Sequence, residues 1–335
     1  MLPLTENGSR CRWFSPILGI ILAFSANGQQ TDAEKLIDAG HWKKARAIVE
    51  ARLARNPNDA LGNFLLSQIR NAFGDYTTPL PLAEKAVALD SHVAKYHRQM
   101  AEVLGLEAEH AGAIRLIFLA RQFRSEIDTA VALDPHDIQA HRDLLEYYLV
   151  APGIAGGDVQ KALAVARKIS ELDAAEGLLA EARVASFRKQ VNEAGKLLRQ
   201  ASGLQPQNYR ARVALARFYV APESFNPAMA SSVAKDLLKL DSGRVEPYAI
   251  LAQVYAEQGE WNVLDSVLNE AARQEPDDLA PYYRAAETLL AKRREPARAE
   301  RYLRVYLEQE PEGNEPTVAD ARRKLAAANS FERKG

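Results

Sequence analysis

The sequence predicts an all-α protein, folded as a right-handed α-solenoid of tandem helix–turn–helix repeats. Three observations predict this fold class. A short phrase recurs along the chain at intervals close to 34 residues. Most intervals contain two apolar patterns with helical spacing. No stretch shows the alternation of apolar and polar residues that marks a half-buried strand. Repeats of this length are typical of proteins that stack helix pairs into one continuous body.

The first element, residues 1–28, is expected to be a secretory signal peptide. Arg10 and Arg12 precede an apolar run over residues 13–24, which is shorter than the roughly 20 residues that span a bilayer. Ala26 and Gly28 then supply the small side chains that a signal peptidase requires. The expected product is exported, periplasmic or extracellular, and cleaved near Gly28. An uncleaved N-terminal anchor is the alternative.

The composition excludes several classes of function. The chain has one cysteine, Cys11, which rules out disulfide frameworks, thiolate zinc sites, iron–sulfur clusters and CxxCH haem sites. A net charge of −1 gives no overall attraction to nucleic acid. No basic cluster interleaved with aromatic residues occurs in the sequence. We therefore expect no nucleic-acid partner, no cofactor and no metal, and contact with a membrane only through the N-terminal segment if that segment is uncleaved.

The recurring phrase is an apolar run followed by an acidic or amide residue, and often by proline. The intervals between its middle residues are 34, 44, 39, 32, 36, 34 and 35 residues. Residues of these types end one helix and open a turn. We therefore expect about eight helix pairs, forming one solenoid over residues 29–313, with phrases centred on Asn56, Asp90, Asp134, Asp173, Gln205, Asp241, Glu275 and Glu310.

Residues 245–276 show the two helices of a unit most clearly. Apolar residues follow helical spacing over the first half, a glycine breaks the helix, and a second apolar stripe ends at a proline. Glycine suits the break because the end of a helix often needs a positive φ. Small residues in other units, such as Ala45 and Ala230, let the two helices approach closely. The pattern consists of Tyr248, Leu251, Ala252, Tyr255, Gly259, Trp261, Leu264, Leu268, Ala271 and Pro276.

Several units depart from this pattern. The third is about ten residues too long, so its second helix, at about 111–132, should project beyond its neighbours. The fourth and sixth units carry insertions at 151–158 and 221–227, and such insertions often lie on a binding face. In the fifth unit, Lys189 stands at the place of the glycine. Residues 314–335 should form a capping helix and tail, because a solenoid needs a polar outer face at its end.

At these positions the chain resembles the tetratricopeptide repeat family. The resemblance is close in three units and weaker in the others. It implies protein–protein binding through the concave surface of the solenoid. The residues that carry it are Gly40, Trp42, Ala45 and Pro57, then Gly74, Tyr76 and Ala86, together with the residues of the 245–276 pattern.

Catalytic motifs are absent from the sequence. It holds no G-x-S-x-G elbow, no H-E-x-x-H and no phosphate-binding loop with its lysine. His97 and His141 lie 44 residues apart, as do Asp90 and Asp134. The two histidines should therefore share one packing role in successive units. A metal site that adds His110 and a nearby carboxylate is the alternative. We expect no enzymatic activity.

Alignment of the units places a set of side chains on the inner face of the first helices. The recurring arginines can grip carboxylates with two hydrogen bonds each, which would suit an acidic or C-terminal peptide. The alternative is that Arg98 and Arg142 pair within their own helices, at i+4 spacing, with the glutamates four residues on. The candidate groove residues are Phe64, Gln68, Arg98, Glu102, Arg142, Glu146, Arg183, Arg217, Gln253 and Arg284.

The sequence therefore predicts a non-catalytic scaffold or assembly adaptor that binds a partner peptide or protein in its concave groove. Two alternatives remain. One is a membrane-tethered envelope assembly factor that keeps its N-terminal helix. The other is an accessory subunit of an enzyme complex.

Overall fold

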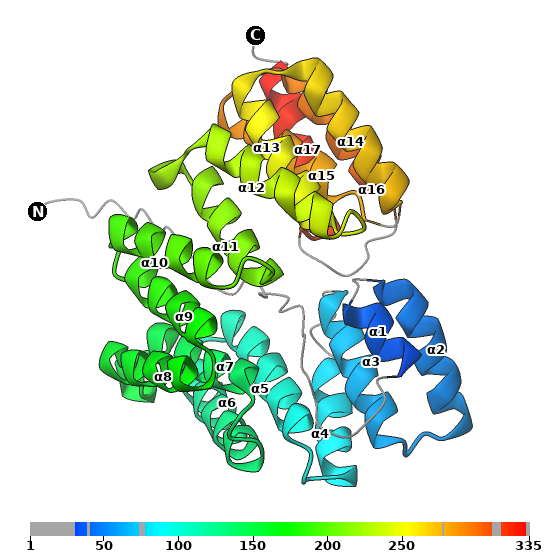
Figure 1. The fold of residues 1–335 in the computed structure, drawn as a ribbon. Helices are drawn as coiled ribbons and strands as arrows, with labels where there is room; N and C mark the ends of the chain where they lie inside the picture. The colour runs from blue at the N-terminus through cyan, green and yellow to red at the C-terminus, as the bar shows by residue number, and fades with distance from the viewer. Residues whose placement is uncertain (1–30, 39–40, 74–77, 277, 310–315, 333–335) are drawn as a thin grey trace, which may run out of the picture.

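The protein is described by a computed structural model over residues 31–38, 41–73, 78–276, 278–309 and 316–332. These residues form an α-solenoid without strands, as the sequence predicts (Figure 1). Helices alternate as first and second members of eight pairs, and one further helix follows. The pairs are α1 (Asp32–Asp38) and α2 (Trp42–Arg55), α3 (Ala60–Ala72) and α4 (Pro79–Leu89), α5 (Ala94–Glu109) and α6 (Ala113–Leu133), α7 (Ile138–Val150) and α8 (Val159–Leu172), α9 (Ala174–Phe187) and α10 (Val191–Leu204), α11 (Tyr209–Val220) and α12 (Pro227–Leu240), α13 (Val245–Gln258) and α14 (Trp261–Gln274), α15 (Ala280–Ala291) and α16 (Pro296–Glu308), followed by α17 (Val318–Glu332).

The recurring phrase forms the turn between one pair and the next. In the described turns its acidic or amide residue is the C-cap of the second helix, and in four of them its side chain accepts a hydrogen bond from the backbone N–H two residues later. Asp90 accepts from His92 at 3.1 Å and Asp134 from His136 at 3.0 Å. Asn56 and Asp241 do the same. Such Asx turns explain why these residue types recur at this position.

Alanines pack the inside of each pair. Ala45, Ala162, Ala194, Ala230 and Ala299 are all buried. A side chain no larger than a methyl group lets two helix axes approach to the lower end of the usual 8–10 Å range.

In the fifth and seventh pairs the hinge between the two helices contains a residue in the left-handed conformation. Gly259 has φ +75° and Lys189 has φ +59° at the equivalent place. In each case the next N–H bonds back five residues, from Glu260 to the Tyr255 carbonyl and from Gln190 to the Ala185 carbonyl. This is the Schellman closure of a helix C-terminus. Lysine therefore adopts the hinge conformation in the fifth pair.

The two insertions form matching loops. Each contains a single 3₁₀ turn, η1 (Gly153–Ala155) and η2 (Pro222–Ser224). Each loop ends at a helix N-cap whose backbone N–H returns to the preceding helix: Asp158 to the Tyr148 carbonyl and Asn226 to the Tyr219 carbonyl, both at 2.8 Å. The Asp158 side chain also caps α8 by accepting from Gln160 N–H at 2.8 Å. This is the capping role that its sequence context indicates.

First helices of successive pairs contact one another, for example α3 with α5, α7 with α9, α9 with α11, and α13 with α15. They therefore form the inner, concave wall, and the second helices form the convex layer. The superhelix turns back on itself, so that α1 and α2 lie opposite α14 and α16 (Figure 1). His41 Nδ1 lies 3.7 Å from the Glu275 carboxylate, which joins the first pair to the turn after the seventh.

Helix α17 covers the end of the solenoid. Ala321 belongs to the same apolar core as Leu303 and Tyr306 of α16. Lys324 Nζ lies 3.0 Å from the Glu287 carboxylate of α15. Among the described side chains of α17, the exposed positions carry only arginine and alanine, Arg322 and Arg323 among them, and none carries a large apolar group.

Two sequence predictions fall outside the described residues. They are the signal peptide over residues 1–28 and the hinge residues Gly40, Gly74 and Tyr76. The phrase centred on Glu310 and residues 333–335 of the predicted tail lie outside as well. Within the part of the chain that the structure describes, no helix has the length and apolar character needed to cross a membrane.

Candidate partner-binding groove

The concave wall carries a ladder of ion pairs that connect one repeat to the next. Arg98 of α5 lies 3.8 Å from Asp137, the N-cap of α7. Arg183 of α9 donates to Glu146 of α7 at 2.7 Å. Arg210 of α11 donates to Glu176 of α9. Each of these pairs spans the joint between two repeats and thereby ties consecutive first helices together.

This pairing corrects one interpretation of the sequence. The i+4 pairs Arg98–Glu102 and Arg142–Glu146 do not form at ion-pair distance. Arg98 instead contacts Asp137, and Glu146 receives Arg183. Glu102 accepts a hydrogen bond from Asn71 of α3 at 3.2 Å. The curvature of the wall brings side chains of neighbouring helices close enough to replace the pairs within one helix.

Two groove arginines stand apart from the ladder. Among the described residues, neither Arg142 nor Arg217 makes a hydrogen bond or an ion pair with a carboxylate. The surrounding wall desolvates the Arg142 guanidinium and, together with the positive charge of Arg98, lowers its pKa to about 10 despite the opposing effect of Asp143. A cation held in this way gains more from an incoming carboxylate than a fully hydrated surface arginine would.

Two acids in the same region have raised pKa values. Desolvation raises the pKa of Asp143 to about 7, with Glu102 adding to the effect while Arg98 and Arg142 oppose it. Gln139 donates a hydrogen bond to the Asp143 carboxylate at 2.7 Å. Desolvation also raises the pKa of Glu102. Near neutral pH the charge of this part of the groove therefore depends on the protonation of Asp143.

The other predicted groove residues differ in their availability. Phe64 is only 3 % exposed and packs against Tyr96, with ring centroids 5.1 Å apart. Phe64 is therefore a core residue, and the sequence prediction that placed its side chain on the groove surface is corrected. Gln68 and Gln253 are half-buried. Arg284 is also half-buried and pairs with Glu287 on its own helix at 2.9 Å.

Sequence reasoning missed three residues of the ladder, Asp137, Glu176 and Arg210, and also missed Asp143 beside it. A signal for one of them was present, because Arg210 lies five residues after the middle of its turn phrase, as does Lys95. Lys95 also reaches back to an earlier first helix, where it pairs with Glu34 of α1 at 2.8 Å. Alignment of this fifth position would have identified a second row of groove residues.

The two histidines occupy the same place in their repeats, as their spacing predicts. Nε2 of His97 lies 3.0 Å from the Ser91 carbonyl, and Nε2 of His141 lies 3.0 Å from the Pro135 carbonyl. Each ring therefore satisfies a carbonyl of the turn six residues before it. Tyr248 and Asn63 make the equivalent contact in other repeats. Across the described ranges, no group of three or more His, Cys, Asp or Glu side chains could hold a metal ion.

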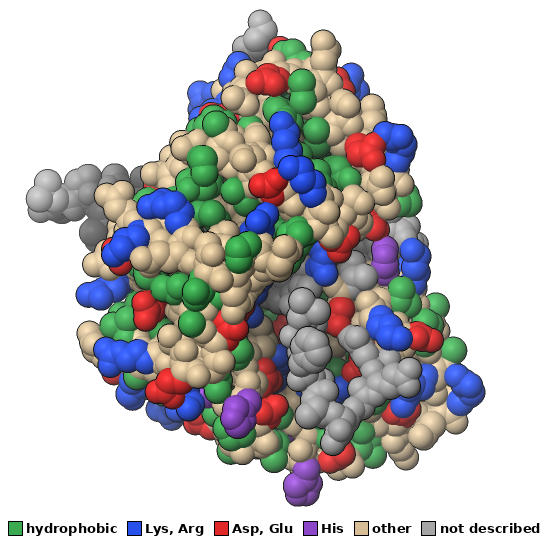
Figure 2. All heavy atoms as spheres, viewed as in Figure 1, with side chains coloured by type: hydrophobic (Ala, Val, Ile, Leu, Met, Phe, Trp, Pro, Cys, Tyr) green, Lys and Arg blue, Asp and Glu red, His purple; other side chains and the backbone are tan. Residues whose placement is uncertain are grey.

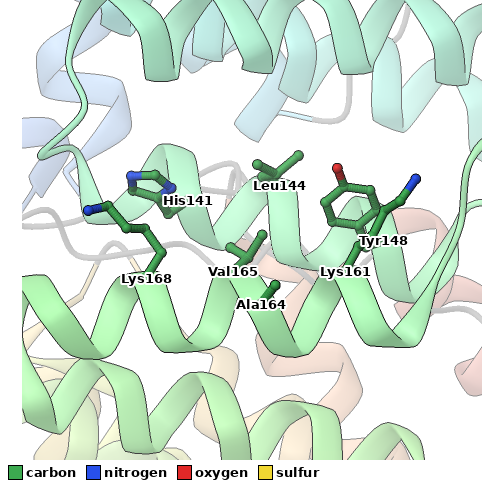
Figure 3. A pocket seen from close by; sticks show the side chains of 7 residues that line it. All are labelled: His141, Leu144, Tyr148, Lys161, Ala164, Val165 and Lys168. Atoms are coloured by element: carbon green, nitrogen blue, oxygen red, sulfur yellow. The ribbon is translucent and has the colours of Figure 1, made fainter.

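A second, shallow groove lies on the convex side between α7 and α8, with a volume of about 310 Å³. Its floor consists of apolar side chains, and Lys161 and Lys168 stand at its two ends, beside Tyr148 and His141 (Figure 3). The floor residues Leu144, Tyr148 and Val165 are each only 8 % exposed. The groove therefore offers little apolar surface of its own, but it contributes two cations to the convex face.

Comparison with known proteins supports the fold. No protein-family model and no curated protein matches this chain. Among solved structures, yeast Tom70 is similar over 94 % of this chain and 67 % of its own, with a TM-score of 0.58 and 14 % identity. A thermophilic TPR protein of Thermus thermophilus is similar over 56 % of this chain and 96 % of its own, with a TM-score of 0.49 and 19 % identity. The chain thus has a TPR-like fold, a conclusion that rests on the Tom70 similarity and on the helix pairs described above.

Proposed function

We propose that the protein is a non-catalytic scaffold or adaptor that binds an extended, acidic segment of a partner protein along its concave groove. The observation that carries the proposal is the presence of two groove arginines, Arg142 and Arg217, without a carboxylate partner among the described residues, on a wall where other arginines are paired. Carboxylates of a bound segment would complete the ladder with charge-assisted hydrogen bonds.

The spacing of the two arginines sets the length of the segment. They lie on α7 and α11, with α9 between them. Two helix-to-helix steps of about 9 Å place them on the order of 20 Å apart. An extended chain rises about 3.3 Å per residue. The preferred segment therefore carries acidic side chains, or an acidic side chain and a C-terminal carboxylate, separated by about six residues.

The cellular compartment and the processing of the N-terminus belong to the same proposal. The polar start, the short apolar run and the small residues before Gly28 support an exported protein with a cleaved signal peptide. Mass spectrometry of the protein recovered from the envelope fraction tests this. Loss of the first residues up to about Gly28 is expected, and a retained Met1 would instead support the membrane-tethered alternative.

The groove is tested by reversing its two unpaired charges. Arg142→Glu combined with Arg217→Glu should weaken binding of a fluorescent peptide with two glutamates six residues apart by at least about a hundredfold, since each lost charge-assisted contact is worth about 1.5–3 kcal/mol. Fluorescence anisotropy measures this change. The circular dichroism spectrum should stay native, because both side chains lie on the groove surface.

The matched control places the same charge change on the outside of the solenoid. Arg199→Glu combined with Arg322→Glu alters two exposed arginines of α10 and α17 and should leave the affinity within about twofold. Equal affinities for the wild type and the groove variant, with both proteins folded, would refute the groove. A separate experiment, affinity capture from the envelope fraction with the wild type and the groove variant in parallel, would identify the natural partner.

A further inference from the structure

The three most exposed large apolar side chains of the described residues gather on two neighbouring elements. Ile114 is 88 % exposed, Ile154 73 % and Phe118 61 %. Ile114 and Phe118 lie one turn apart on α6, and Ile154 belongs to the η1 turn, which contacts α6. We refer to these three residues as the convex tip. Exposed apolar groups gathered in this way commonly mark an interaction surface.

The length of α6 explains why the tip projects. This helix has 21 residues, whereas its neighbours α4 and α8 have 11 and 14. The face of α6 that enters the core consists of Leu119, Phe123 and Ile127. Ile114 and Phe118 lie on the opposite face, by the 3.6-residue period of the helix. The core does not use these two side chains, and no described element covers them.

The convex face around the tip is positively charged. Helices α6 and α8 together carry six cations and three acids, an excess of three positive charges. Asp128 pairs with Arg124 and Glu171 with Lys168, while Glu126 contacts His97. Among the described residues Arg121, Lys161 and Arg167 then make no ion pair with a carboxylate. Close to the tip, Glu107 at the end of α5 is engaged by Arg115 at 2.6 Å, and Glu109 lies nearby. Figure 2 shows Lys and Arg side chains, with Asp and Glu side chains among them, along the edge where Figure 1 places α6 and α8. The cations are Arg115, Arg121, Arg124, Lys161, Arg167 and Lys168.

We propose that the convex tip inserts into the surface of an anionic lipid bilayer. A bilayer surface yields to projecting side chains, so it needs no preformed hollow to receive them. Bulky apolar residues flanked by Lys and Arg are the combination that holds amphipathic segments at the boundary between headgroups and acyl chains. A second copy of the chain fits less well, because a two-fold contact would bring Arg115 and Arg121 of both copies together.

The proposal fixes the orientation of the molecule and goes beyond the groove function. Because the tip lies on the convex layer, the concave groove would face away from the bilayer and stay open to a partner. The proposed contact uses neither Arg142 nor Arg217. An experiment can therefore distinguish a loss of groove binding from a loss of bilayer contact.

The single cysteine of the chain permits a local test. Cys11→Ser is combined with Ile114→Cys, and the new thiol is labelled with an environment-sensitive fluorophore such as NBD. With vesicles of equimolar phosphatidylcholine and phosphatidylglycerol, the emission should shift to the blue and rise severalfold. With pure phosphatidylcholine it should change much less. The matched control is Leu204→Cys, at an exposed position on α10, whose emission should not shift.

Charge reversal provides the second measurement. Lys161→Glu with Lys168→Glu should lower vesicle binding of the labelled protein at least tenfold, since each basic residue near an anionic surface contributes about a fivefold factor. Arg142→Glu with Arg217→Glu should leave vesicle binding unchanged. An unshifted emission at position 114 overturns the proposal even if the protein sediments with vesicles, because the apolar run at residues 13–24 would then be the part that binds. A shift that appears only on adding an acidic protein would also overturn it and assign the tip to a protein partner.

Discussion

Lys189 holds a backbone conformation that favours glycine, and the hinge of the fifth pair depends on it. Its φ of +59° lies in the left-handed region, where a Cβ costs roughly 1–2 kcal/mol. Because glycine has no Cβ, Lys189→Gly should stabilise the protein by about 0.5–1 kcal/mol after its greater entropy in the unfolded chain is counted. Urea denaturation measures this difference.

Lys196→Gly is the control for that measurement, since it places the same substitution in the middle of α10. There the change should destabilise the protein by about 1 kcal/mol. If both variants lose stability equally, the hinge conformation of Lys189 carries no strain.

Asp143 gives the stability of the protein a dependence on pH. Its pKa of about 7 in the folded state lies above the ordinary value of 3.8. The folded state therefore binds the proton more tightly than the unfolded state, and stability falls as the pH rises from about 4 to 7. Asp143→Asn removes this loss. It should stabilise the protein by about 1–2 kcal/mol at pH 8 and by almost nothing near pH 4, as measured by urea denaturation at each pH.

Asp128→Asn provides the comparison, because Asp128 is an exposed acid on the convex side. Its effect should stay within about 0.5 kcal/mol at both pH values. A gain for Asp143→Asn that is the same at pH 4 and pH 8 would contradict the assignment.

At the residue scale, sequence periodicity located side chains better than it located their partners. His97 and His141 share a turn contact because both follow the same phrase by the same number of residues. The partner of Arg98 depends on how far one repeat rotates against the next, and the repeat interval carries no information on that angle. Phe64 was misplaced for a similar reason: adjacent positions of a first helix lie about 100° apart around its axis, so a one-residue error in the alignment exchanges a groove position for a core position.

At the element scale, the anomalies of the repeat interval were informative. The extra residues of the third unit form the long helix α6, and the proline- and glycine-containing insertions form the matching turns η1 and η2. Insertions are visible in a sequence because they change the number of residues between two successive recurring phrases. The exposure of Ile114 and Phe118 was not evident, since both fit the helical pattern that elsewhere indicates a buried face.

Helix α17 closes the apolar core, and its removal should show this. Truncation after residue 316 would expose Tyr306, Leu303 and Tyr283, which are all at most 3 % exposed. Large apolar side chains each lose about 1.5–3 kcal/mol of burial when fully exposed. We expect a loss of several kcal/mol, with the last pair unfolding first. Hydrogen exchange of the backbone amides of α15 and α16 measures this loss of stability.

Arg322→Ala controls for the loss of charge in α17, because Arg322 is exposed. Its effect should be within about 0.5 kcal/mol. If the truncated protein keeps full protection in α15 and α16, the helix is not needed to close the core.

At the scale of the whole molecule, the superhelix nearly completes a circle. His41 and Glu275 come from the first pair and the turn after the seventh, and their side chains approach to 3.7 Å. Joining these positions covalently should slow the association of a groove-binding peptide. The test uses His41→Cys and Glu275→Cys in a Cys11→Ser chain, bridged by a short bismaleimide and followed by stopped-flow fluorescence. Equal rates for the bridged and unbridged proteins would show that partners do not pass between these two parts.

The nearly closed circle also separates how long a partner stays from how tightly it is held. A segment with a free end can slide out along its own length. A segment flanked by folded domains on both sides must wait until the circle opens, whatever the strength of its carboxylate contacts. Two partners with the same acidic sequence would then have the same equilibrium preference for the arginines but very different residence times, depending on whether the segment lies at a terminus or inside its chain.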